Sequence, residues 1–234
     1  MKYVVILLCV LVQLAPAKDS PSVRLGLSFI VSFPSMDDEK DFAEMTNASG
    51  LDFDLGSTAW GGSVEVLGDL GDRFRIRGGV SVSRLHGAYT EGYDPLSYVL
   101  IGLFTAGLGF FLSQSEDVID LDDEAVSVEA EAYYLFSRTS GFSLSAGVGP
   151  VFTFANRSLA SPNTVTKGSG SGIGMIASLR LDQESVWELG CLPLMFGLEA
   201  GYRMNSVDID DQEAENFQLD FSGPFLKAGT YIGL

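Results

Sequence analysis

The chain has little of what disulfide-bonded, nucleic-acid-binding or low-complexity proteins depend on. Only two of its 234 residues are cysteine and only eight are proline. Cys9 lies in the leader discussed below, so Cys191 has no partner and no internal disulfide can form. Few prolines beside 27 glycines speak against a low-complexity tail. With 14 basic and 31 acidic residues, the net charge of −17 speaks against binding of nucleic acid, which favours basic surfaces.

The first apolar run is too short to cross a membrane as a helix, which needs about 20 apolar residues. Met1 and Lys2 precede apolar residues 4–14, and Ala15-Pro16-Ala17 follows them. A positive start, a short apolar core and an A-x-A site predict a secretory signal peptide. We expect cleavage after Ala17, which leaves residues 18–234 as one domain. We expect no lipidation at Cys9, because a lipoprotein signal would have a small residue in place of Leu8.

What the chain has in abundance is alternation of apolar residues with small or polar ones. In the clearest stretch one face carries Val23, Leu25, Leu27, Phe29, Val31 and Phe33, and the other carries Arg24, Gly26, Ser28, Ile30 and Ser32. A period of two is the side-chain period of an extended strand. The same pattern predicts seven further strands, at 58–67, 73–85, 126–136, 142–155, 171–181, 192–204 and 222–234.

The connections between these strands also follow a pattern. Long or medium segments (34–57, 86–125, 156–170 and 205–221) alternate with short or medium ones (68–72, 137–141 and 182–191). An even number of antiparallel strands, with short turns at one rim and longer loops at the other, is typical of outer-membrane proteins. We therefore expect an all-β fold, an eight-stranded antiparallel up-and-down transmembrane β-barrel with both termini on the periplasmic side.

Alternation alone does not say which face points outward, because a soluble lipocalin-like barrel alternates as well. Three features favour a membrane barrel. The polar face is rich in glycine, serine, arginine and glutamate, and its glycines leave room for large buried side chains. No charge lies in mid-strand on the apolar face, where it would cost about 2–4 kcal/mol. Apolar-face aromatics fall at strand ends and predict two interface girdles: Phe33, Trp60, Phe152, Phe154 and Tyr202 at one rim, and Phe74, Tyr134, Phe136, Phe142 and Phe196 at the other.

In this architecture the chain resembles the small eight-stranded outer-membrane β-barrel family, the OmpA-, OmpX- and OmpW-like proteins with a porin-like barrel domain. The resemblance covers residues 23–234, and its best local piece is the C-terminal segment 225–234, FLKAGTYIGL. That family's insertion signal has a terminal aromatic with apolar residues at every second position before it. Leu226, Ala228, Ile232 and Leu234 keep the spacing, with Leu234 in place of the aromatic. The resemblance implies insertion into the outer membrane by the barrel-assembly machinery.

The polar face predicts a set of charges inside the barrel. Its members are Arg24, Glu65, Arg73, Arg75, Arg77, Glu129, Glu131, Arg180, Glu199, Arg203 and Lys227. Strand adjacency suggests that Glu65 and the glutamates of 126–136 face the arginines of 73–85. We expect a structural ion-pair network that fills the lumen. The alternative is a narrow, anion-preferring pore, because bases outnumber acids in this set.

The long loops carry 21 of the 31 acidic residues and only one basic residue, Lys40. The acidic runs 117–124 and 208–215 could bind divalent cations through oxygen ligands, or bridge through them to anionic lipid head groups. The weak candidates are Asp117, Asp120, Asp122, Asp208 and Asp210. Neither run has the spacing of an EF-hand, so we expect a solvated acidic surface, no metal site and no cofactor.

Two features remain outside this scheme. His86 is the only histidine and lies at the outer end of a strand, where some barrel lipases and proteases keep catalytic groups. A Ser–His–acid device needs a nucleophile within hydrogen-bond reach. Gly87 and Ala88 follow His86, so we expect no catalytic residues.

Segment 96–112, LSYVLIGLFTAGLGFFL, is apolar on every side and predicts a short helix in the second outer loop. A gate for apolar solutes and a further hairpin are its alternatives.

We therefore expect an integral outer-membrane β-barrel of a Gram-negative cell envelope, with a structural, surface-interaction or narrow-pore role and no enzymatic activity. The first alternative is transport of small apolar solutes across the outer membrane, as the OmpW-like resemblance implies, through segment 96–112. The second is an outer-leaflet lipid-modifying or proteolytic enzyme. The expected partners are outer-membrane lipid and the barrel-assembly machinery.

Overall fold

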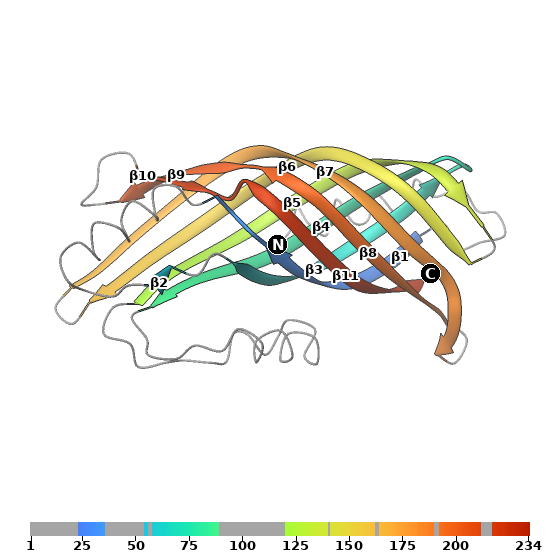
Figure 1. The fold of residues 1–234 in the computed structure, drawn as a ribbon, viewed down its shortest axis with the longest axis horizontal. Coiled ribbons are helices and arrows are strands. Elements are labelled where there is room, and N and C mark those ends of the chain that lie inside the picture. The colour runs from blue at the N-terminus through green and yellow to red at the C-terminus, as the bar shows by residue number, and fades with distance from the viewer. Residues whose placement is uncertain are drawn as a thin grey trace.

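The computed structural model describes residues 23–35, 54–55, 58–88, 120–139, 141–161, 164–189, 192–211 and 217–234. These residues form a long antiparallel barrel of steeply inclined strands (Figure 1). The strands are β1 (Val23–Ser32), β2 (Asp54–Leu55), β3 (Ala59–Leu70), β4 (Phe74–Ala88), β5 (Asp120–Arg138), β6 (Phe142–Ser161), β7 (Thr164–Leu189), β8 (Leu192–Met204), β9 (Ser206–Asp211), β10 (Phe217–Asp220) and β11 (Gly223–Gly233).

Eight of these strands close a ring, which confirms the predicted fold class. Neighbours around the ring are β1, β3, β4, β5, β6, β7, β8 and β11, and β11 pairs with β1 to complete it. The amide N of Leu234 donates to the carbonyl O of Val23 at 2.9 Å. The start of β1 and the end of β11 therefore lie at the same rim as the short turns after β3 and β5, which we call the short-turn rim.

At the opposite rim, the long-loop rim, the strands run further than the sequence predicted. β5 begins at Asp120, and β6 and β7 continue through residues 156–170, where a medium-length connection was expected. Within 205–221, predicted as a long loop, β9 and β10 pair with each other as a hairpin, and β9 also pairs with β7. The prediction stopped too early because outward residues turn polar there, as at Glu124 and Asn156. Alternation of apolar with polar residues then no longer marks a strand.

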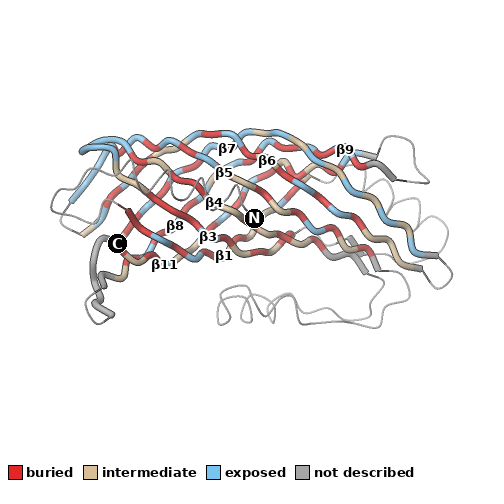
Figure 2. Tube along the Cα trace, turned by 180° about the vertical axis from the view of Figure 1, so that it is seen from behind, coloured by how far each residue is buried: buried red, intermediate tan, exposed pale blue. Residues whose placement is uncertain are grey.

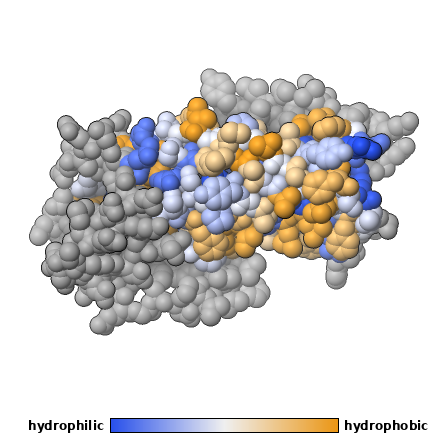
Figure 3. Space-filling model, turned by 45° about the horizontal axis from the view of Figure 1, so that its top comes forward, coloured by the Kyte–Doolittle hydropathy of each residue, from blue (hydrophilic) through white to orange (hydrophobic). Residues whose placement is uncertain are grey.

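The apolar face points outward. Leu27 is 54% exposed and Leu198 58%, whereas Arg75 and Arg77 on the inner face are 0% and 2% exposed. Figure 2 shows buried and exposed residues alternating along the strands, and Figure 3 shows hydrophobic side chains over the barrel wall with the most hydrophilic ones toward its ends. A lipocalin-like barrel, with its apolar face inward, is therefore excluded for the described residues.

The outward apolar band has the height of a bilayer core. On β6 it extends from Phe142 to Phe154, and the next outward residue is the polar, exposed Asn156. About twelve residue steps of ~3.3 Å on a strand tilted by about 40° span roughly 30 Å, close to the hydrocarbon thickness. We call the part of the wall between these levels the lipid band.

Glycines on the inner face make room for tyrosine rings. Gly26 pairs across strands with Tyr231, and a Cβ at Gly26 would lie 2.1 Å from that ring. Gly147 pairs with Tyr133 in the same way, and a Cβ there would lie 2.6 Å from the ring. An eight-stranded interior is only just wide enough for side chains. Each large ring therefore takes the space that its cross-strand neighbour leaves.

Among the described residues no helix has the length and apolar character to cross a membrane. The predicted helix at 96–112 and the signal peptide at 1–17 lie outside the described residues. Residue 18, where the predicted domain begins, also lies outside the described residues.

The lipid band makes a testable prediction on one strand. Val148 points outward midway along the band and is 51% exposed. Val148→Arg should lower the free energy of unfolding of the vesicle-inserted barrel by about 2–4 kcal/mol, because a charge at the bilayer midplane loses its hydration. Urea titration of the vesicle-inserted protein, followed by its heat-modifiable migration on gels, measures the change.

The control is Asn156→Arg on the same strand, above the band, which should change stability by less than about 0.5 kcal/mol. If Val148→Arg proved as harmless as Asn156→Arg, the outer face of β6 would be facing water.

Candidate functional site: the filled lumen

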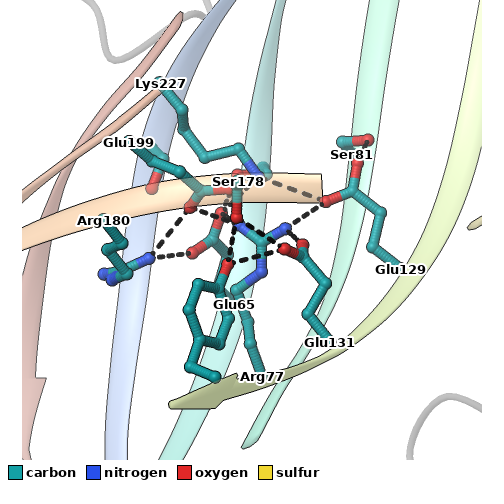
Figure 4. A network of polar contacts seen from close by, with 12 residues as sticks. Glu65, Arg77, Ser81, Glu129, Glu131, Ser178, Arg180, Glu199 and Lys227 are labelled. Atoms are coloured by element: carbon teal, nitrogen blue, oxygen red, sulfur yellow. Dashed lines mark hydrogen bonds and ion pairs between the residues drawn. The ribbon is translucent and has the colours of Figure 1, made fainter. Parts of the chain in front are cut away.

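The centre of the lumen is organised around Arg77 of β4. Its guanidinium lies among four glutamates from three strands of the wall (Figure 4). The Nη1 atom lies 2.8 Å from Glu199 Oε2 and 3.4 Å from Glu65 Oε1. The Nη2 atom lies 2.9 Å from Glu129 Oε2 and also contacts Glu131, which pairs directly with Arg77 in the β4–β5 register.

Three further cations complete this network, and one of them, Arg203 on β8, contacts Glu129 Oε1 through its Nη2. Lys227 Nζ on β11 lies 2.9 Å from Glu65 Oε1 and 3.1 Å from Glu129 Oε2. Arg180 Nη1 on β7 lies 3.2 Å from Glu199 Oε2. These side chains come from strands on opposite sides of the ring, so the contacts tie the wall together across the lumen. Cations and carboxylates that share such contacts compensate much of the desolvation each one suffers on burial.

Hydroxyl groups also donate hydrogen bonds to these carboxylates. The OH of Tyr231 donates to Glu65 Oε2 and the OH of Tyr133 to Glu131 Oε2, both at 2.8 Å. Ser81 Oγ donates to Glu129 Oε1 at 3.0 Å. The tyrosines seated against the glycines are therefore part of the same polar layer.

Nearer the short-turn rim a second group of ion pairs closes the lumen. Asp69 Oδ1 lies 2.6 Å from Arg75 Nε, and Asp69 Oδ2 lies 3.1 Å from Arg24 Nη2. Arg75 also bonds Asp182 through its Nη1, and Arg180 Nε lies 2.8 Å from Asp182 Oδ1. Together with the central network these residues form what we call the charge layer.

The charge layer is electrically balanced, unlike the set predicted from the sequence. Its bases are Arg24, Arg75, Arg77, Arg180, Arg203 and Lys227, and its acids are Glu65, Asp69, Glu129, Glu131, Asp182 and Glu199, six of each. Placing Arg73 in the lumen was wrong: it lies exposed in the turn before β4, where its Nη1 is 3.4 Å from the outward Tyr134 OH.

Asp69 and Asp182 were missed, although both continue the inward period of their strands. Asp69 follows Glu65 and Leu67, and Asp182 follows Ser178 and Arg180. Both lie inside predicted connections, Asp69 in 68–72 and Asp182 in 182–191, where an acid is ordinarily solvated. Without them the bases outnumbered the acids, and that surplus was the reason for considering an anion-preferring pore.

Above the charge layer, toward the long-loop rim, the lumen becomes less polar. Ser127 Oγ and Thr153 Oγ1 are 2.7 Å apart, and Asn205 Nδ2 donates to Thr153 Oγ1 at 2.6 Å. Beyond these hydroxyls lies a cluster of buried apolar side chains, the apolar layer: Ala59, Leu85, Ala125, Ala155, Val207, Ile209, Leu219 and Phe221. Four of its members belong to β9, β10 and the residue after them, so the hairpin helps to fill the outer end.

The predicted interface aromatics all lie on the outer face. Phe33, Phe74, Tyr134, Phe136, Phe142, Phe154, Phe196 and Tyr202 are exposed, and Trp60 and Phe152 are half-buried. Phe74 and Tyr134 pack edge-on at the short-turn rim with ring centroids 5.6 Å apart. Their role as two membrane girdles stays a prediction.

The structure gives the metal candidates no shared site. Asp122 points outward and both of its oxygens accept from Arg84, and Asp208 accepts from Gln218 Nε2 at 2.9 Å. Asp117 and the side chains of Asp120 and Asp210 lie outside the described residues. Within the described part of the chain no group of three or more His, Cys, Asp or Glu is placed to hold a metal. The backbone of His86 lies in β4, and its side chain is also outside the description.

Comparison with solved structures agrees with this geometry. The outer-membrane protein OprG of Pseudomonas aeruginosa superposes with a TM-score of 0.50 at 11% identity, covering 91% of this chain and 96% of that one. The attachment invasion locus protein Ail of Yersinia pestis gives 0.46 at 14% identity, with 90% and 96% covered, and Neisserial surface protein A gives 0.43 at 14%, with 93% and 100% covered. No protein-family model matches the chain, and no curated protein matches it in sequence.

Arg77 should be the residue whose loss costs most in the charge layer. Arg77→Met leaves its four glutamates short of a cation, so the free energy of unfolding should fall by about 3–5 kcal/mol. Arg73→Met, at the exposed turn, should cost less than about 0.5 kcal/mol. Urea unfolding in detergent micelles or vesicles measures both variants.

Adding Glu131→Gln to Arg77→Met tests whether the loss of stability comes from the lost ion pairs of Arg77 or from its lost volume. Because the second change removes one uncompensated negative charge, the double variant should be more stable than Arg77→Met alone. Equal stability of Arg77→Met and Arg73→Met would contradict the central role of Arg77.

Proposed function

We propose that this chain, which has the fold of the small eight-stranded outer-membrane β-barrels, is an integral protein of the bacterial outer membrane that keeps its lumen closed. In this proposal it acts through the structure it projects from the long-loop rim. The observation that carries the proposal is the charge layer, a balanced and buried set of cations and carboxylates that fills the barrel from wall to wall.

Ion conduction needs a hydrated path, and the charge layer places buried, paired side chains across the described lumen. The side chains of Arg77, Arg180 and Lys227 are at most 1% exposed. Each cation is held by carboxylates from neighbouring or facing strands, so moving one aside would leave its partners as uncompensated buried charges. The apolar layer above would present a second barrier to any ion.

The projecting part offers a surface at the long-loop rim. β5, β6 and β7 continue past the lipid band, and β9 and β10 extend the wall on the same side (Figure 1). Outward residues there are polar, as at Glu124, Asn156 and Asp208. With the termini on the periplasmic side, this rim faces the outside of the cell, where a structural or surface-interaction role is possible without catalysis.

The wall facing the bilayer gives the partner of this proposal, outer-membrane lipid. The barrel-assembly machinery is the partner expected during insertion, on the strength of the C-terminal segment 225–234. Transport of apolar solutes through 96–112 gains no support here, since that segment lies outside the described residues.

Reconstitution into planar bilayers tests the closed lumen. The purified wild-type barrel should show no steady conductance, because the charge layer blocks the centre of the lumen. Fully folded protein, identified by heat-modifiable migration, is the sample, and an open porin in the same bilayer is the positive control. A steady anion-selective current through the wild-type barrel would contradict the proposal.

Cysteine labelling of intact cells tests the orientation. In a Cys191→Ser background, Gln218→Cys on β10 should react with a membrane-impermeant maleimide in whole cells. Asp72→Cys, in the exposed turn between β3 and β4, should react only after the outer membrane is broken. Both sites are exposed, so they differ only in the rim on which they lie. The reverse result would place the termini and short turns outside.

A further inference from the structure

Among the described residues, the outer end of the lumen holds one buried acid that does not belong to the charge layer. Asp123 of β5 is 0% exposed, and neither of its carboxylate oxygens has a hydrogen-bond partner. Each of the six acids of the charge layer, by contrast, accepts a hydrogen bond from at least one base. A buried carboxylate without donors is costly in its charged form, so Asp123 needs an explanation of its own.

Asp123 lies beside the apolar layer and above the lipid band. Its neighbours along the inner face of β5 are Leu121 and Ala125, both buried, and on β4 it pairs with the buried Leu85. Its register partner on β6 is Arg157, three residues beyond Phe154, where the lipid band ends. The surroundings are therefore mainly apolar, although this level of the wall lies outside the bilayer core.

Among the described side chains, few charged groups lie around Asp123. Its register partner on β6 is Arg157, which pairs with Gly168 of β7, and Gly168 in turn pairs with Asp211 of β9. On its own strand Asp122 points to the other face, where it is bound by Arg84. On β4 the described register partner of Asp123 is Leu85, which is uncharged.

The hairpin of β9 and β10 packs against the same apolar surroundings. The next inward-facing residue of β5, Ala125, pairs with Ala155 of β6, which pairs with Gly170 of β7, and Gly170 pairs with Ile209 of the hairpin. Ile209 packs with Leu85 and Ala125 in the apolar layer. The hairpin is joined to the barrel through two interruptions, Asn205 after β8 and 221–222 before β11. Those interruptions are bridged by a hydrogen bond from Phe221 N to Asn205 O at 2.9 Å.

We propose that Asp123 is a proton-operated latch for this hairpin: the neutral carboxyl allows β9 and β10 to seat in the outer end of the lumen, and ionisation loosens them. The proposal rests on the hairpin being part of the lumen closure. Loosening would expose the apolar layer, while the charge layer beneath stays intact.

The direction of the pH effect follows from burial. Burial raises the pKa of Asp123 to about 7; the positive charge of Arg157 opposes the rise and the negative charge of Asp122 adds to it. With the hairpin open, the carboxyl reaches water and returns to an ordinary pKa near ~4. Seating is therefore strongest below about pH 4 and weakens about tenfold per pH unit up to about 7. Above that pH it levels off, because both states are then ionised.

Amide hydrogen exchange on the full chain in detergent micelles tests the latch. After correction for the intrinsic pH dependence of exchange, protection of amides in β9 and β10 should fall about tenfold per pH unit between pH 5 and 7 and then level off. In Asp123→Asn, whose side chain is similar in shape and does not ionise, protection should be independent of pH. Asp123→Leu is a second neutral variant with the same expectation.

The matched control is Asp208→Asn on the outward face of β9, which should keep the wild-type pH dependence. Amides of β6 within the lipid band should stay protected throughout. The latch would be ruled out by three results: no pH dependence in the wild type, the same dependence in Asp123→Asn, or loss of protection along β6 together with the hairpin. None of these results depends on whether the barrel conducts ions, so the closed-lumen proposal fails or stands separately.

Discussion

The structure depends on the pairing of charges that a narrow barrel confines between its walls. Arg77 and its four glutamates lie where neither lipid nor bulk water can solvate them, so each charge must find its counter-charge on another strand. That requirement links β3, β4, β5, β7, β8 and β11 through side chains as well as through backbone ladders. It also fixes the register, since a slip of one residue would turn these charges toward the lipid.

The same requirement explains the small residues of the inner face. A ring such as Tyr231 or Tyr133 both donates to a glutamate and occupies the space beside a paired glycine. The same tyrosine side chains thus donate hydrogen bonds to the glutamates and fill the space beside the glycines. The lumen then changes in character along its axis, from ion pairs through hydroxyl groups to the apolar layer, and the hairpin of β9 and β10 completes the last of these.

The wall changes character at a different level from the lumen. On β6 the outer face becomes polar at Asn156, while on the inner face apolar side chains persist beside it, as at Ala155. Above the lipid band the barrel therefore has apolar side chains inside and polar side chains outside, the reverse of its arrangement within the band. Asp123 lies in that region and is buried without a hydrogen-bond partner, whereas every acid of the charge layer is paired with a base.

The composition of the polar face and the aromatics at the strand ends favoured an apolar face that points outward. Period-two alternation in the sequence determined the ring of eight strands and most of the charge layer, because these follow from which residues share a face. It could not set where strands end beyond the bilayer, since there both faces lose the contrast that lipid imposes. It therefore read 205–221 as a loop and Asp123 as one of many solvated acids. Arg73, Asp69 and Asp182 lay beside turns, where one residue of register decides between lumen and solvent. Tertiary structure alone decided those positions, and with them the balance of charge, because a charge is paired only once the facing strands have met.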